Sequence, residues 1–141
     1  SAASDVYKRQ LQMAVKDAGI PLEEIAYINA HATSTPVGDL NEAKAIAEVF
    51  GNHRPYVTST KSQTGHEMWM AGASEVIYSI LMMNNGFIAP NLNFEEPDEA
   101  SALLNIPSRR IETEFDTFLS NSFGFGGTNS SLIIRKFKEN N

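Results

Sequence analysis

The chain has 141 residues, of which 42% are hydrophobic and 20% charged, so its composition is that of one ordinary globular domain or a piece of one. Eleven Lys and Arg against 17 Asp and Glu give a net charge of -6, which argues against a nucleic acid as partner. Cysteine is absent, which excludes disulfides and a cysteine nucleophile on this chain. The absence of cysteine also makes the cytoplasm the expected location. No apolar run reaches the ~18 residues of a membrane span and no signal-peptide pattern opens the chain, so we expect no membrane partner.

The first ten residues differ in character from the rest of the chain. The run Asp5–Gln10 matches what one reading frame of a common sequencing-library adapter encodes. We therefore interpret residues 1–10 as a non-native leader or adapter scar and assign the domain to residues 11–141.

Apolar periodicity predicts that helices and strands alternate along the remainder. The predicted elements are a helix over 11–18, a strand over 25–30, a helix over 40–50, a strand over 56–60, a helix over 69–84, and strands over 116–120 and 131–137. Gly19 and Gly51 are expected to end the first two helices. Residues 87–99 look irregular, and 103–106 form a candidate short strand. This order predicts an α/β layered sheet.

The third predicted helix carries many apolar residues. Those assigned to its buried face are Ala73, Val76, Ile77, Ile80 and Leu81.

Polar loops follow three of the predicted strands. They begin at His31, at Lys61 and at Asn121, and the second also contains His66. Ligands of layered α/β sheets bind beyond the strand ends, so we expect these loops to share one opening. A histidine there can donate a hydrogen bond to a carbonyl oxygen or accept a proton, or it can simply cap a strand or begin a helix.

Two further features of these loops have both a functional and a structural interpretation. The hydroxyls of Thr33 and Thr35 can bind the amide groups of a ligand or cap the local backbone. The glycine-rich run 124–127 lacks the Lys-Ser/Thr of a phosphate-binding loop. Two interpretations remain, a mobile aromatic gate and a tight turn between strands. The separation of His31 and His66 does not match the spacing of two metal ligands on one helix, so we expect no metal site. The third histidine, His53, is expected at the surface.

Three segments carry a resemblance to a known family: Tyr27–Asp39, Thr60–His66 and Asn121–Asn129. In sequence, order and separation they resemble the C-terminal half of a β-ketoacyl-acyl-carrier-protein synthase of the elongating type, a condensing enzyme of the thiolase fold. The resemblance covers about residues 11–136. It implies a thiolase-like layered α-β-α half-domain with a mixed sheet, truncated at its N-terminal side because the family places one further strand inside the sheet.

The resemblance also implies a reaction, the decarboxylative Claisen condensation of fatty acid biosynthesis. A cysteine in the N-terminal half of the family takes the acyl chain from acyl carrier protein as a thioester. Malonyl-acyl-carrier-protein then loses CO₂, and the carbanion attacks that thioester. His31 and His66 match the two catalytic histidines, which are expected to hold the malonyl carbonyl, while Lys61 matches the family lysine and Glu42 its acidic partner.

Other matches concern the substrates. Thr33 and Thr35 match the residues that bind the pantetheine arm, Phe125 matches the gating aromatic, and Phe123 lies beside it. The implied partners are acyl carrier protein, malonyl and acyl thioesters and, for the full-length parent, a second copy in a homodimer. No cofactor is expected, because the substrate itself carries phosphopantetheine.

The chain departs from the family at a few positions. Ala32 stands where the family usually has glycine, and the bulky Trp69 and Met70 follow the second histidine. Because the cysteine half is absent, we expect the chain to be inactive by itself. Alternative interpretations are a non-catalytic chain-length-factor-like partner, a polyketide synthase ketosynthase piece, or a module that only binds pantetheine.

Overall fold

The computed structural model describes residues 2–30, 36–58, 71–90, 102–123 and 129–137. Within these ranges it describes only the backbone of residues 2–3, 36–39, 71–74, 122–123 and 129. No helix in the described ranges is long and apolar enough to cross a membrane.

The described elements alternate between helices and short strands. In chain order they are α1 (Ala2–Ala18), the 3-10 turn η1 (Leu22–Glu24), β1 (Tyr27–Asn29), α2 (Pro36–Phe50), β2 (Tyr56–Thr58), α4 (Ala71–Asn85), β3 (Phe87–Ile88), β4 (Ile111–Glu112), β5 (Thr117–Phe123) and β6 (Asn129–Arg135). The main sheet has the order β2-β1-β5-β6, with β1 parallel to both of its neighbours and β6 antiparallel to β5. β3 and β4 form a separate antiparallel pair. The predicted mixed sheet is confirmed.

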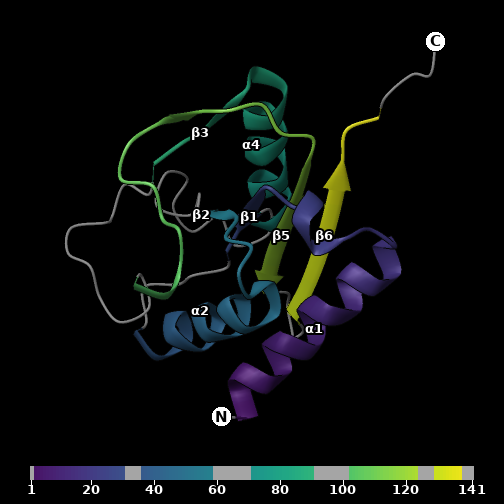
Figure 1. Ribbon diagram of the computed structural model, residues 1–141, viewed down its shortest axis with the longest axis vertical. Helices are drawn as coiled ribbons and strands as arrows, with labels where there is room; N and C mark the ends of the chain where they lie inside the picture. The colour runs from purple at the N-terminus through teal and green to yellow at the C-terminus, as the bar shows by residue number, and fades with distance from the viewer. Residues whose placement is uncertain (1, 31–35, 59–70, 91–101, 124–128, 138–141) are drawn as a thin grey trace.

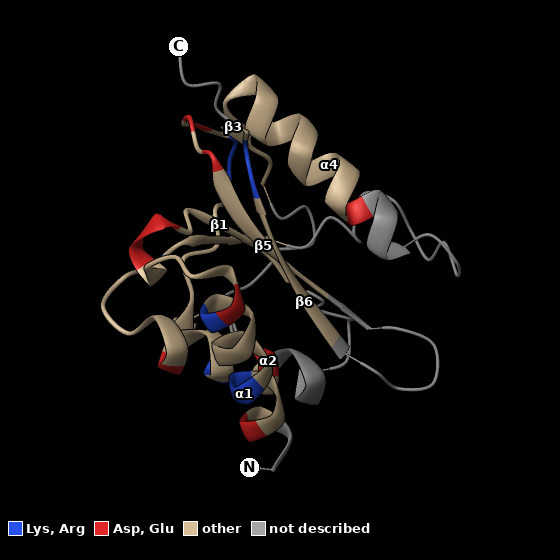
Figure 2. Cartoon of the chain, turned by 90° about the vertical axis from the view of Figure 1, so that its right-hand side faces the viewer, with Lys and Arg blue, Asp and Glu red and all other residues tan. Residues whose placement is uncertain are grey.

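Helices cover both faces of the main sheet. α1 and α2 lie against one face and α4 lies against the other, as the two views show (Figures 1 and 2). The core accordingly has two halves. On the α1 and α2 side, the fully buried residues include Leu11, Ile28 and Leu119. On the α4 side they include Tyr27 and Phe118. The predicted α-β-α layering is therefore confirmed.

The alternation of side chains along β1 explains this division. Successive residues of a strand point to opposite faces. Ile28 therefore packs with the α1 and α2 cluster, whereas Tyr27 packs with the α4 cluster and Asn29 hydrogen-bonds to α4. All three side chains are 0% exposed, as the predicted buried strand requires.

The first helix is longer than predicted. α1 begins at Ala2 instead of residue 11. Tyr7, Leu11 and Val15 lie four residues apart on it and pack against the same core cluster, and this spacing continues the apolar face toward the N-terminus. The interpretation of residues 1–10 as a leader concerns their origin and stays a prediction.

The buried face of α4 also differs from the prediction. Ile77 is 54% exposed and Leu81 is 49% exposed, whereas Glu75 and Ser79 are buried against the sheet. The described part of the helix carries apolar residues on most of its sides, so periodicity alone selects no face. Polar partners on β1 decide which side packs inward.

Two smaller expectations about the second half of the chain are wrong. Of residues 87–99, which were expected to be irregular, the structure describes 87–90, and Phe87–Ile88 form β3, whose partner β4 lies more than twenty residues further along the chain. Residues 103–106 form no strand with any other described segment, and Asn105 makes an isolated bridge to Tyr56. Within the described main sheet β1 pairs directly with β5, so no strand lies between these two.

Candidate functional site

Three of the candidate loops leave the sheet at the same edge. β2, β1 and β5 lie side by side and run parallel, so their carboxyl ends point the same way. The last residue of β1, Asn29, pairs with Thr58 on one side and with Ser120 on the other. The chain positions where the loops begin are therefore adjacent, as the sequence predicts.

Most of the predicted site residues lie in the loops themselves. His31, Thr33, Thr35, Lys61, His66 and Phe125 fall outside the described residues. The backbone of Phe123 forms the end of β5, and Glu42 is described in full. The structure thus describes the strand and helix residues next to which these loops begin and end, and we call these residues the framework.

Glu42 lies on α2 and is only 3% exposed. Asn121 Nδ2 donates a hydrogen bond of 3.1 Å to Glu42 Oε2. Asn121 Oδ1 accepts a second bond of 2.7 Å from Ser131 Oγ. The carboxyl group of Glu42 is therefore tied through one amide to both β5 and β6, at the end of the sheet from which the loops leave.

A second polar contact lies on the opposite face of the sheet. Asn29 Nδ2 donates to the backbone oxygen of Glu75 at 3.2 Å and to Ser79 Oγ at 3.0 Å. Ser79 Oγ in turn donates to the same Glu75 oxygen at 2.8 Å. These three residues are at most 1% exposed, so this contact joins the end of β1 to α4 in the core.

Tyr27 continues this group of buried polar contacts toward β2. Its hydroxyl hydrogen-bonds to Thr58 Oγ1, which lies at the end of β2. Burial raises the pKa of Tyr27 above the ordinary tyrosine value, the hydrogen bonds of Thr58 and Ser79 oppose this, and the nearby Glu75 carboxyl adds to it. The hydroxyl therefore stays protonated at neutral pH.

The sequence interpretation missed part of this framework. Asn29 is a polar residue in an otherwise apolar strand, and Glu75 and Ser79 lie four apart on a helix rich in apolar residues. Buried polar side chains need partners, so a polar residue inside an apolar run was the available signal. Together, the described amides, hydroxyls and carboxyls can fix the strand ends from which the loops leave. Within the described residues, no group of three His, Cys, Asp or Glu side chains is arranged to hold a metal ion.

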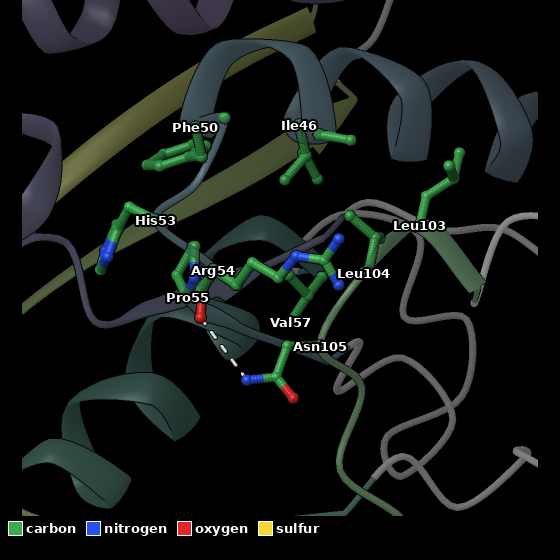
Figure 3. Close-up of a pocket in the computed structure, with 11 residues that line it drawn as sticks. Ile46, Phe50, His53, Arg54, Pro55, Val57, Leu103, Leu104 and Asn105 are labelled. Atoms are coloured by element: carbon green, nitrogen blue, oxygen red, sulfur yellow. Dashed lines mark hydrogen bonds between the residues drawn. The ribbon is translucent and has the colours of Figure 1, made fainter.

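One cavity of about 110 Å³ lies apart from this framework, beside the edge strand β2 and the end of α2 (Figure 3). Its walls include Ile46, Phe50 and Val57. His53, which was predicted at the surface, borders it and is half-buried, and its Nε2 donates a 2.7 Å hydrogen bond to the carbonyl oxygen of Ile25. None of the predicted site residues belongs to the described lining of this cavity.

Comparison with known families gives a match over most of the chain. The model of the family described as "Beta-ketoacyl synthase, C-terminal domain" matches residues 2–95. The 3-oxoacyl-acyl-carrier-protein synthase 1 of Escherichia coli is 50% identical over 131 residues, which are 93% of this chain and 32% of that protein. The Haemophilus influenzae protein of the same name is 47% identical over 92% of this chain and 32% of its own length. The chain therefore spans about a third of the length of these relatives.

Solved structures agree with the sequence matches. A β-ketoacyl synthase from Burkholderia phymatum superposes with a TM-score of 0.86 at 40% identity, over 96% of this chain and 33% of that one. A type II polyketide synthase acyl carrier protein in complex with its ketosynthase gives a TM-score of 0.84 at 34% identity, over 94% of this chain and 33% of that one. The thiolase-like fold implied by the sequence motifs is confirmed.

Proposed function

The chain belongs to the β-ketoacyl synthase C-terminal domain family, and we propose that it is the C-terminal third of a 3-oxoacyl-acyl-carrier-protein synthase. The observation that carries the proposal is the 50% identity to such a synthase over 93% of the chain. The parent enzyme would be an acyltransferase of fatty acid biosynthesis that condenses malonyl-acyl-carrier-protein with an acyl thioester.

The proposed reaction forms one carbon–carbon bond. The malonyl thioester loses CO₂ and leaves a carbanion, which attacks the carbonyl of the acyl-cysteine thioester and expels the cysteine thiolate. We assign His31 and His66 to the malonyl carbonyl oxygen, where negative charge develops. One aimed donor of this kind contributes about 3–4 kcal/mol to catalysis in well-studied enzymes.

The remaining predicted residues support this chemistry. Lys61 is assigned to electrostatic support of the histidines, with Glu42 as its acidic partner. The burial of the Glu42 carboxyl beside Asn121 supports a role inside the protein, because a buried carboxylate requires hydrogen bonds or a cation. Thr33 and Thr35 would bind the pantetheine arm, and Phe123 and Phe125 would form the gate.

The proposal includes the partners and the location of the parent protein. Acyl carrier protein is the proposed partner, and the match to a ketosynthase in complex with its acyl carrier protein supports this. We further propose a homodimer for the full-length parent, the cytoplasm as its location, and no cofactor beyond the phosphopantetheine of the substrate. The chain by itself should be inactive, because it contains no cysteine.

A chimera tests the assigned roles. The matching third of the Escherichia coli synthase is replaced by residues 11–141, and malonyl decarboxylation and acyl transfer to the enzyme are measured separately. His66→Ala should abolish decarboxylation and leave acyl transfer measurable. His53→Ala is the matched control, since His53 lies outside the proposed machinery, and it should retain both. Normal decarboxylation in the His66→Ala chimera would overturn the assigned role.

A further inference from the structure

The contact between Asn29 and α4 joins two elements that lead to different candidate loops. The Nδ2 atom of Asn29 donates to Glu75 O at 3.2 Å and to Ser79 Oγ at 3.0 Å. The Ser79 hydroxyl completes a triangle by donating to Glu75 O at 2.8 Å. Asn29 and Ser79 are 0% exposed, so no water competes for these bonds.

Asn29 lies two positions from His31, and Glu75 lies nine positions from His66. His31 is only two positions beyond Asn29, a stretch of at most about 7 Å. His66 precedes Ala71, the first described residue of α4, by five positions, and Glu75 lies about one helical turn beyond Ala71. The distance between the starting points of the two histidine segments therefore depends on how β1 is held against α4.

We propose that Asn29 is a positioning residue: its amide fixes the end of β1 to α4 and thereby sets the spacing between His31 and His66. This inference rests on the proposed function, in which both imidazoles bind one developing oxyanion. Errors of about 1 Å in such a geometry lower rates by about 100-fold. A purely structural Asn29 would instead affect stability and all partial reactions together.

Substitutions in the chimera separate these two roles. Asn29→Ala removes both hydrogen bonds to α4, and Ser79→Ala removes one of them while Glu75 O remains as acceptor. The matched control is His53→Ala, which removes a part-buried hydrogen bond near the opposite end of β1, to Ile25 O. The measured quantities are kcat and KM of malonyl-acyl-carrier-protein decarboxylation, the rate of acyl transfer to the cysteine, and the thermal midpoint.

Asn29→Ala should lower kcat of decarboxylation by about 10- to 100-fold, with KM and acyl transfer changed less than about twofold. Ser79→Ala should give a smaller loss of the same kind, and it serves as the test if Asn29→Ala does not fold. His53→Ala should change neither rate. Equal losses in decarboxylation and acyl transfer, or a loss no larger than that of His53→Ala, would overturn the proposal.

A structural measurement keeps this proposal separate from the proposed function. Crystal structures of the chimera with and without Asn29→Ala should show the separation of the His31 and His66 rings changed by about 1 Å or more. An unchanged separation would overturn the positioning role. An unsubstituted chimera that folds but never decarboxylates would contradict the proposed function, and the ring separation would still decide the role of Asn29.

Discussion

Glu42 shows what the buried polar residues contribute at the scale of single side chains. The family resemblance predicts it as the acidic partner of Lys61. The structure places its carboxyl group in the core, where Asn121 donates to it and is itself held by Ser131. The pairing with Lys61 stays a prediction, and the buried environment gives that lysine a physical role, since a cation would stabilise the carboxylate.

Substitution of Glu42 tests this network. Glu42→Leu leaves the Asn121 amide without this acceptor in the core and should lower the stability of the chimera by about 1–3 kcal/mol. Glu42→Gln keeps an acceptor oxygen and should cost less. Urea unfolding measures both, and equal losses for the two variants would show that the hydrogen bond from Asn121 contributes little.

Tyr27 gives a pH-dependent prediction. Burial raises its pKa, so the folded state retains the proton to higher pH than the unfolded state does. The resulting stability is fully present below the unfolded pKa of about 10 and is lost as pH rises above it, by at most about 1.4 kcal/mol per pH unit. Tyr27→Phe should reduce this loss between pH 9 and pH 11, measured as the change in thermal midpoint. An identical alkaline loss in both proteins would contradict the assignment.

At the scale of elements, the sequence predicts well where local chemistry decides. Gly19 and Gly51 have φ of 66° and 58°, a conformation that favours glycine, and they follow α1 and α2 as predicted. The buried strand β1 and the apolar face of α2, with Ala43, Ile46 and Phe50 in the core, also follow from periodicity. The motifs shared with the family additionally predict which loops leave this sheet.

Tertiary contacts decide the features that the sequence did not predict. The inward face of α4 is selected by the bonds of Asn29 to Glu75 and Ser79, which join positions 46 and 50 residues apart. The pairing of β3 with β4 is also between distant segments. Single-sequence periodicity contains no information about such partners. The polar framework of the candidate site could not be predicted for the same reason. Its residues are far apart in the sequence and come together only in the folded structure.

The end of α2 offers a test of local chemistry. A Cβ at position 51 would contact nothing within 4 Å, so the cost of Gly51→Ala is backbone strain alone. We expect a loss of about 1–2 kcal/mol in urea unfolding of the chimera, and a smaller loss for Gly51→Asn because asparagine tolerates positive φ better. Lys44→Ala, at an exposed position of the same helix, is the control and should be nearly neutral. No difference between Gly51→Ala and the control would contradict the assigned helix end.

At the scale of the whole molecule, α4 presents apolar side chains to solvent. Ile77, Tyr78 and Leu81 are 54%, 42% and 49% exposed on this helix. Exposed apolar groups that cluster in this way are typical of surfaces that another part of a protein covers. The chain spans only 32% of the Escherichia coli relative, which agrees with a piece that packs against the remainder of a longer protein.

This surface predicts the behaviour of the full 141-residue chain when it is produced alone. We expect self-association, measured by sedimentation velocity, and the double substitution Ile77→Gln with Leu81→Gln should reduce it. Met13→Gln is the matched control, because Met13 is 59% exposed on α1, away from this face. Equal effects of the two changes, or a strictly monomeric unsubstituted chain, would contradict the assignment of the α4 surface.

The formation of 3-ketoacyl product by the chimera tests the central claim most directly. Residues 11–141 replace the matching third of the Escherichia coli synthase, and the assay supplies malonyl- and acyl-acyl-carrier-protein. If this chain is the C-terminal part of a condensing enzyme, the product forms catalytically, and the same protein with His66→Ala gives none. A folded chimera whose cysteine accepts the acyl chain but which makes no 3-ketoacyl product would contradict the claim and favour a non-catalytic relative.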